Sequence, residues 1–171
     1  MQVDLERGVW RPATERDLPA IVAIADEIHV AYPEDDAIIA ERLRLYPRGC
    51  ALLEVAGKPL AYTLTHPWHY AEPPALNVML GALPEHATTY YIHDIALLSE
   101  VRGMGAAGAI VKAIIAEAEA AGAPNLSLVA VNGSVPFWSR FGFVVTEEPA
   151  LTKKLLTYDA DARFMVRRIA G

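Results

Sequence analysis

The segment from Val101 to Gly108 places three glycines within six residues, at positions 103, 105 and 108. It connects residues 90–98, which are typical of a strand, to residues 109–118, which are typical of a helix. A glycine-rich turn that opens a helix leaves backbone N–H groups free at the positive end of the helix dipole. Because such groups bind phosphate, this segment predicts a site for a phosphorylated cofactor.

Two common nucleotide-binding motifs explain this turn poorly. A P-loop requires a Lys followed by Ser or Thr, and the segment has no such pair. Residues 103–108 do match the dinucleotide motif Gly-x-Gly-x-x-Gly, but that motif also needs an acidic residue at the end of the next strand. The next predicted strand, residues 126–131, is followed by Asn132. The preceding segments also do not alternate as strand, helix and strand, which disfavours the dinucleotide interpretation.

The elements that must position the turn follow from hydrophobic periodicity and from the placement of Gly and Pro. Thr14 is expected to cap a helix that runs to about Val30, with Asp17 as its capping-box partner. Residues 66–89 predict a long loop with a short helical turn at 76–83. The other predicted elements are strands at 9–13, 50–56, 59–65, 126–131, 143–146 and 164–169 and helices at 37–45 and 135–141. This order predicts an α+β fold on a mixed sheet, as one domain over residues 1–171 with its core at about 9–169.

Composition narrows the class of protein. The formal net charge of −6 argues against nucleic acid as a main partner. The longest apolar run, residues 106–116, is interrupted by Lys112, so we expect no membrane partner. The N-terminus lacks the pattern of a secretory signal, and the single cysteine, Cys50, fits a reducing compartment. We therefore expect a cytoplasmic protein in which Cys50 is an inert core residue.

Two sequence signatures resemble those of the GNAT (GCN5-related) N-acetyltransferase family. The run from Arg102 to Ala107 resembles the family's Arg/Gln-x-x-Gly-x-Gly/Ala signature. Residues 132–143, with Asn132, an aromatic pair and a final Gly-Phe, are similar to the second signature. Residues 10–18 also resemble the family's opening strand and helix, and the likeness extends from about 9 to 169. It implies the GNAT fold, a mixed central sheet of six to seven strands flanked by about four helices, with strands 4 and 5 splayed apart.

The resemblance also implies acetyl-coenzyme A as cosubstrate, with no metal. The backbone of the fourth strand would bind the pantetheine amides, and the turn would bind the pyrophosphate. The residues implied for cofactor binding are Ile95, Ala96, Leu97, Arg102, Gly103, Met104, Gly105, Ala106, Ala107, Asn132 and Trp138. Two of these have a plainer alternative, because the Arg102 side chain could simply be solvated and Asn132 could cap the helix at 135–141.

In this family the amine attacks the thioester directly, which calls for a base and for a proton donor to the leaving thiolate. The family's usual tyrosine donor is replaced here by Trp138, whose indole N–H is a very weak acid. His93 is the candidate base, Asp94 could hold an ammonium group or a water, and Tyr91 is a possible substitute donor. Neighbours on a strand point to opposite faces, so His93 and Asp94 cannot both line one cleft without a bulge. The alternative is that one of them only binds loop backbone.

Substrate contacts are expected from two segments, residues 31–36 and the start of the long loop. The candidate substrate residues are Tyr32, Asp35, His66, Trp68 and His69. The acids at 34–36 could instead be a solvated helix start. The histidines at 66, 69, 86 and 93 lack a tight ligand spacing, so no metal site is predicted.

Together these features predict an acetyl-coenzyme A-dependent N-acetyltransferase acting on a primary amine of a small molecule or peptide. Trp138 motivates an alternative, a catalytically weak acyl-coenzyme A-binding sensor or partner-binding module on the same fold. Neither the acceptor nor the choice between monomer and homodimer follows from the sequence, because one fold hosts many substrates.

Overall fold

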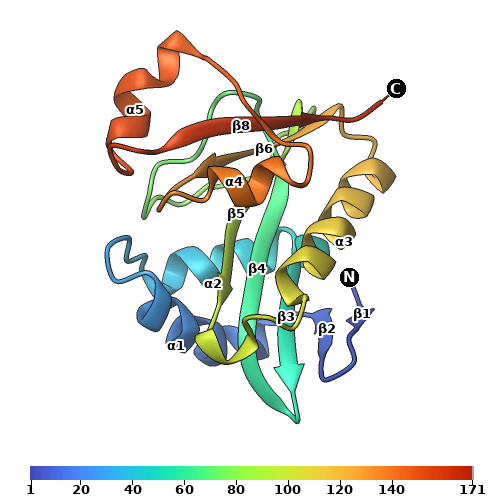
Figure 1. Cartoon of the computed structure of the whole chain (residues 1–171). Helices are drawn as coiled ribbons and strands as arrows, with labels where there is room; N and C mark the ends of the chain where they lie inside the picture. The colour runs from blue at the N-terminus through green and yellow to red at the C-terminus, as the bar shows by residue number, and fades with distance from the viewer. Residues whose placement is uncertain (171) are drawn as a thin grey trace.

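In the computed structural model, which describes residues 1–170, one eight-stranded sheet runs through the molecule (Figure 1). Its spatial order is β1-β2-β3-β4-β5-β6-β8-β7. The strands are β1 Val3–Asp4, β2 Val9–Pro12, β3 Cys50–Val55, β4 Lys58–Trp68, β5 Thr89–Leu97, β6 Asn125–Ala130, β7 Val144–Val145 and β8 Arg163–Arg168. Neighbouring strands are antiparallel except for β5 and β6, which are parallel. The mixed sheet is confirmed, with eight strands instead of six or seven, because the two-residue strand β1 adds to one edge.

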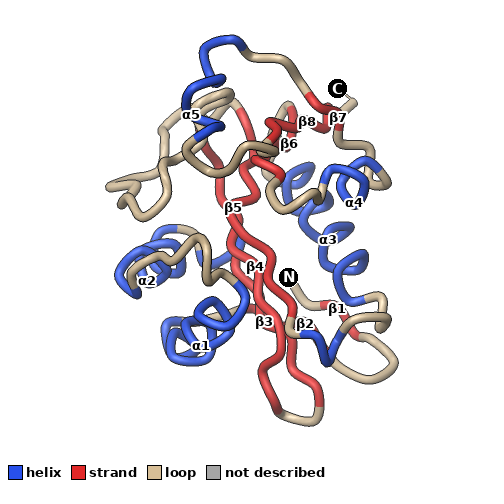
Figure 2. The backbone as a smooth tube through the Cα atoms, turned by 60° about the vertical axis from the view of Figure 1, so that its left-hand side comes forward, coloured by secondary structure: helices blue, strands red, loops and turns tan. Residues whose placement is uncertain are grey.

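Five α-helices cover the sheet within the described residues: α1 Leu18–Ile28, α2 Asp36–Leu45, α3 Ala106–Ala120, α4 Val135–Ser139 and α5 Thr152–Leu156. Figure 2 shows α1 and α2 on one face and α3 and α4 on the other. The short helix α5 was not predicted and makes five helices where about four were expected. None of the helices in the described part of the chain is both long and apolar enough to cross a bilayer.

The local signals at the first helix are confirmed. Thr14 and Asp17 form a capping box, in which the Thr14 N–H donates to the Asp17 carboxylate at 2.8 Å. A 3₁₀ turn at Glu15–Asp17 then leads into α1, whose residues Ile21 and Ile24 are buried. Arg11 on β2 binds Asp17 at 2.7 Å, so the start of this helix is tied to the sheet.

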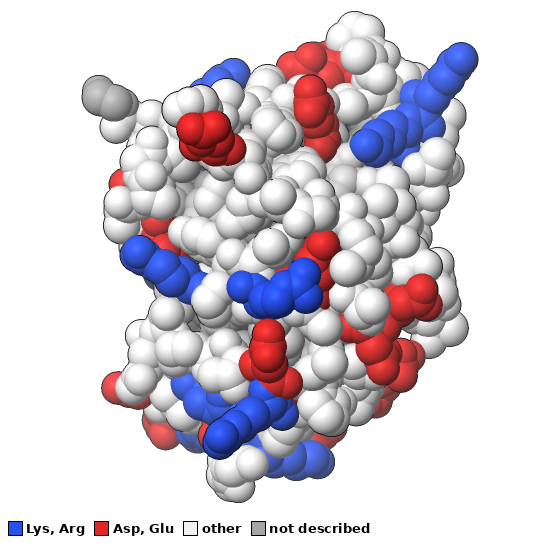
Figure 3. Space-filling model, turned by 180° about the vertical axis from the view of Figure 1, so that it is seen from behind, with Lys and Arg blue, Asp and Glu red and all other residues white. Residues whose placement is uncertain are grey.

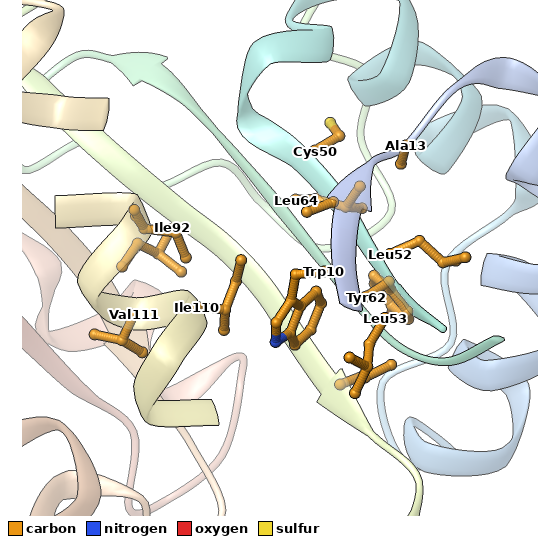
Figure 4. Close-up of a cluster of buried hydrophobic side chains, with 14 of the residues drawn as sticks. Trp10, Ala13, Cys50, Leu52, Leu53, Tyr62, Leu64, Ile92, Ile110 and Val111 are labelled. Atoms are coloured by element: carbon orange, nitrogen blue, oxygen red, sulfur yellow. The ribbon is translucent and has the colours of Figure 1, made fainter. Parts of the chain in front are cut away.

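Trp10 links the sheet to the helix that follows the glycine turn. It is fully buried and lies between Ile110 on α3 and Leu53 and Tyr62 on the sheet (Figure 4). Its indole N–H donates to the Ala106 carbonyl at 3.0 Å. The start of α3 is therefore held by a side chain 96 residues earlier in the chain. Cys50 is also fully buried, and burial raises the pKa of its thiol to about 12, so its predicted place in the core is confirmed.

The long loop is shorter than predicted and contains no helix. β4 continues to Trp68 and β5 begins at Thr89, so the loop spans residues 69–88. β3 begins at Cys50, opposite Leu64, so Pro67 lies where β4 pairs only with β5 and its missing N–H is tolerated. The helical turn predicted at 76–83 is wrong, because Asn77 and Gly81 adopt positive φ angles of 59° and 79°.

Charged side chains are interspersed on the face seen from behind (Figure 3), without a large field of either sign.

Candidate active site

A β-bulge in β5 brings His93 and Asp94 to the same site. Leu64 pairs with Asp94 and Thr65 pairs with Ile92, so His93 is the extra residue on β5. Both His93 and Asp94 line the same two adjoining cavities. Simple strand alternation would have separated them, and the bulge is what overrides that alternation.

The larger cavity is a cleft of about 340 Å³ between β5 and β6. These strands pair only at Tyr90–Leu126 and Tyr91–Ser127 and then part. The β6-facing backbone of residues 92–97 is therefore not used by the sheet. Cleft residues include Ile95, Leu97, Ala107, Asn132, Phe137 and Trp138. The splaying expected of strands 4 and 5 occurs here as β5 and β6, because β1 shifts the count by one.

The glycine turn lies at the end of this cleft where α3 begins. Gly103 and Gly105 have φ angles of 80° and 73°, which favour glycine, and no other heavy atom lies within 4 Å of the position a Cβ would take. In the described residues the turn's backbone hydrogen bonds run from Met104 to Val101 and from Ala109 to Gly105. The N–H groups at 105–108 are left for a ligand, so the turn fits a pyrophosphate.

The other residues of the turn divide between the surface and the core. Arg102 is exposed, whereas Ala106 is buried and Met104 packs against the core. Gly105, Lys112 and Phe141 border a separate open hollow of about 660 Å³ on α3.

Glu34 lies beside His93. Its carboxylate is 2.8 Å from the His93 Nε2 and accepts the Asn77 N–H at 3.0 Å. Burial alone would raise the pKa of Glu34, but its hydrogen bond and charge interaction with His93 outweigh this and lower the pKa to about 2. From the sequence, Glu34 belonged to an acidic group that could contact the substrate or begin a helix, and its pairing with His93 was not predicted. The pairing across 59 residues leaves no local sequence signal.

Asp94 is held by two residues that the sequence did not single out. Its carboxylate is 2.8 Å from the Nε2 of His29 and also accepts the Tyr62 hydroxyl. Burial lowers the pKa of His29, but Asp94 more than offsets this and the net shift is upward. The pKa of the Tyr62 phenol lies well above 10 because of burial and the neighbouring Asp94. His29 directly follows α1, and only the fold brings it to β5.

A smaller cavity of about 70 Å³ adjoins the cleft at His93 and Asp94, and we call it the acceptor pocket. It is lined by His29, Tyr32, Glu34, Pro74, Leu76, Tyr91, His93, Asp94, Val129, Val131 and Tyr158. Tyr32 donates to Asp159 at 2.8 Å, and Tyr158 donates to the Pro74 carbonyl. These bonds join three segments that are far apart in the sequence.

The structure separates the predicted substrate residues. Tyr32 lines the acceptor pocket. Tyr91, the candidate proton donor, lines it too, and burial places the pKa of its phenol well above 10. Asp35 is exposed and binds Asn77. The remaining three, His66, Trp68 and His69, border neither of the two cavities.

Local contacts account for those three residues. His66 is buried, its Nδ1 lies 2.9 Å from the Pro67 carbonyl, and burial lowers its pKa to about 3. The indole N–H of Trp68 donates to the Glu72 carbonyl at 2.8 Å, and the His69 ring packs against the Trp68 ring. In the part of the chain that the structure describes, no three His, Cys, Asp or Glu side chains are grouped to hold a metal ion.

The second signature contributes Asn132 and Trp138 to the cleft wall. Asn132 has a positive φ of 55° and its N–H donates to Asp159, while Ser134 is the residue that caps α4. The capping role considered for Asn132 is therefore wrong. Trp138 is 8% exposed and packs edge-on against Phe137 and Phe143.

Comparisons with known proteins agree with this geometry. The model of the acetyltransferase (GNAT) family matches residues 16–143, about three quarters of the chain. No curated protein sequence gives a match.

Solved structures share the fold at low sequence identity. Ard1 from Thermoplasma volcanium is 19% identical with a TM-score of 0.73, covering 96% of this chain and 99% of that chain. The loading GNATL domain of CurA from Lyngbya majuscula is 12% identical with a TM-score of 0.78, covering 94% and 97%. N-acetylglutamate synthase from Neisseria gonorrhoeae, complexed with coenzyme A and N-acetyl-glutamate, is 16% identical with a TM-score of 0.71. That match covers 99% of this chain but 37% of the synthase.

Proposed function

Because this chain belongs to the GNAT acetyltransferase family, we propose that it transfers the acetyl group of acetyl-coenzyme A to a primary amine by direct attack. One observation carries the proposal. A cleft between β5 and β6 runs from the glycine turn to His93 and Asp94, where it meets the acceptor pocket. A cofactor bound at the turn and an amine in the pocket would meet at these two side chains.

Cofactor binding would rest mainly on backbone groups. The N–H groups at 105–108 would bind the pyrophosphate at the positive end of the α3 dipole. The unpaired backbone of Ile95 and Leu97 would bind the pantetheine amides as an added strand would. Asn132 and Trp138 would form the opposite wall of the cleft. Several structural neighbours were solved with coenzyme A or an acyl-coenzyme A, which supports the same use of this cleft.

The proton chemistry would lie with the two His–carboxylate pairs. His93 would accept the proton of the incoming ammonium, since a free amine is the nucleophile. Glu34 would orient the His93 ring through its 2.8 Å contact. Asp94, fixed by His29 and Tyr62, would attract and place the ammonium group.

The leaving thiolate has no phenol at the family's usual position, because Trp138 occupies it. This feature motivates the alternative function, a catalytically weak acyl-coenzyme A-binding module. The two functions share the cleft and differ only in turnover.

Titration with acetyl-coenzyme A, followed by a thiol-release assay on a library of primary amines, tests the proposal. We expect cofactor binding and turnover with a subset of amines. Tight binding without turnover on any amine would favour the binding module. Failure to bind the cofactor would contradict both functions.

A further inference from the structure

The acceptor pocket has carboxylates but no free cationic side chain. Glu34 and Asp94 line it, and the hydroxyl of Tyr32, another lining residue, donates to Asp159. Its two histidines are already paired, His93 with Glu34 and His29 with Asp94, each at 2.8 Å. Among the described residues, no Lys or Arg borders the pocket. The site can therefore stabilise a cation but offers no counterion to a substrate carboxylate.

Arg42 does not provide the pocket with a counterion for a substrate carboxylate. Its charge acts on Glu34, but the side chain is only 1% exposed and its guanidinium is bound to Glu41 at 2.9 Å. Glu41 in turn accepts the N–H groups of Leu80 and Gly81. The Arg42–Glu41 pair thus anchors the 69–88 loop and does not face the acceptor.

The rest of the acceptor pocket is apolar and small. Its walls are Pro74, Leu76, Val129, Val131 and the rings of Tyr91 and Tyr158. Its volume is about one fifth that of the cleft. The Tyr32–Asp159 and Tyr158–Pro74 hydrogen bonds tie the surrounding segments together.

Building on the proposed function, we propose that the acceptor is a small primary amine with an aliphatic or aromatic body and no carboxylate. Its ammonium group binds between Glu34 and Asp94, and its body contacts the apolar walls. An α-amino acid would bring its carboxylate against these two acids, and such a contact between like charges is unfavourable. The like-charge contact disfavours free amino acids as acceptors, and the small volume of the pocket disfavours peptides.

Three acceptors that differ at one group test this directly: phenethylamine, L-phenylalanine and L-phenylalanine amide. We expect kcat/KM in the thiol-release assay to be about 100-fold higher for phenethylamine than for L-phenylalanine, from the like-charge cost. The neutral amide should recover most of that loss. Equal values for the amine and the amino acid, or a peptide that surpasses phenethylamine, would overturn the inference.

Calorimetry with the coenzyme A complex separates this inference from the proposed function, because it requires no turnover. Binding of phenethylamine but not of L-phenylalanine, without any turnover, would uphold the acceptor class and contradict the acetyltransferase. Binding of neither, or of both equally, would contradict the acceptor class whatever the turnover.

A charge introduced into the wall provides a second test. Leu76 is half-buried and lines the pocket, so Leu76→Arg would supply the missing counterion. We expect the ratio of kcat/KM for phenethylamine to that for L-phenylalanine to be about tenfold smaller in this variant, because the arginine can form one charge pair with the amino acid carboxylate. Val78→Arg is the matched control, because Val78 is 49% exposed on the same loop and lies outside the pocket. An unchanged preference in Leu76→Arg would count against the inference.

Discussion

The Nε2 of His93 lies 2.8 Å from a carboxylate oxygen of Glu34, which fixes a ring that the β5 bulge has turned toward the cleft. Glu34 is itself held by the Asn77 N–H at 3.0 Å, so the pair depends on the 69–88 loop as well as on the sheet. An imidazole held in this way has one nitrogen bound to the carboxylate and its orientation set, which is the arrangement expected of a positioned base.

Removing the imidazole should remove the base. We expect His93→Ala to lower kcat at least about 100-fold, the usual range for a general base, and to change the pH dependence of kcat/KM. His86→Ala is the control, because His86 is exposed on the 69–88 loop. The pH dependence of kcat/KM in a stopped thiol-release assay measures the effect. If His93→Ala keeps the wild-type pH profile, His93 is not the base.

The same pair should make the stability of the fold depend on pH. The pKa of Glu34 falls from its ordinary value of 4.5 to about 2 in the folded protein. Its contribution is therefore fully present above about pH 4.5 and is lost as the pH falls through about 2. The pKa difference corresponds to about 3 kcal/mol.

Urea unfolding between pH 7 and pH 2 measures this contribution. Glu34→Gln should remove it, so the free-energy gap between wild type and variant should close as the pH falls. Glu100→Gln is the control, since Glu100 pairs with Lys58 at the surface and should change stability by less than about 1 kcal/mol. A gap that stays constant down to pH 2 would show that the carboxylate of Glu34 is not the source.

A negative charge introduced into the glycine turn should prevent cofactor binding. Gly105→Glu should abolish acetyl-coenzyme A binding, because it places a carboxylate and a side chain at the proposed pyrophosphate site. Gly57→Glu controls for backbone strain, since Gly57 has a similar φ of 77° and is equally open, but lies in the β3–β4 hairpin. Isothermal titration of the two variants compares them. Unchanged affinity in Gly105→Glu would place the cofactor elsewhere.

The sequence predicted the parts of the site whose signals are local. The turn at 103–108 and the capping box at Thr14 depend on residues close in the chain, and the sequence predicted both. The mixed sheet followed from the order of the predicted elements, and its splayed strands followed from the resemblance. Glu34 and His29 were not assigned to the site, because they reach it only through tertiary contacts to His93 and Asp94.

The bulge shows why the residues of β5 that face the cleft were hard to predict. From the sequence, a strand presents alternate residues to each face, so His93 and Asp94 could line one cleft only if the strand contained a bulge. A single unpaired residue in β5 provides that bulge. The error at 76–83 has a similar cause, because Glu41 and Glu34 bind the backbone N–H groups at 77, 80 and 81 and hold an irregular loop.

Trp10 should support the cofactor site from a distance. Trp10→Phe removes the indole hydrogen bond to the Ala106 carbonyl and leaves a small gap in the core. We expect the free energy of unfolding to fall by about 2 kcal/mol and the affinity for acetyl-coenzyme A to weaken, because the start of α3 is less well fixed. Trp68→Phe is the matched control, since that indole donates to the Glu72 carbonyl at an exposed position. Denaturant unfolding measures both variants, and an equal fall in the free energy of unfolding would contradict the role of Trp10.

Trp138 lines the cleft where the family usually has its phenolic proton donor, so the substitution Trp138→Tyr tests what limits turnover. If protonation of the leaving thiolate is slow in the wild type, a phenol at this position should raise kcat several-fold, because it is a far stronger acid than an indole. The KM for acetyl-coenzyme A should change little in comparison. Trp138→Phe, which removes the indole without adding a donor, is the control and should not raise kcat. A kcat in Trp138→Tyr no higher than in Trp138→Phe would show that the donor is not limiting.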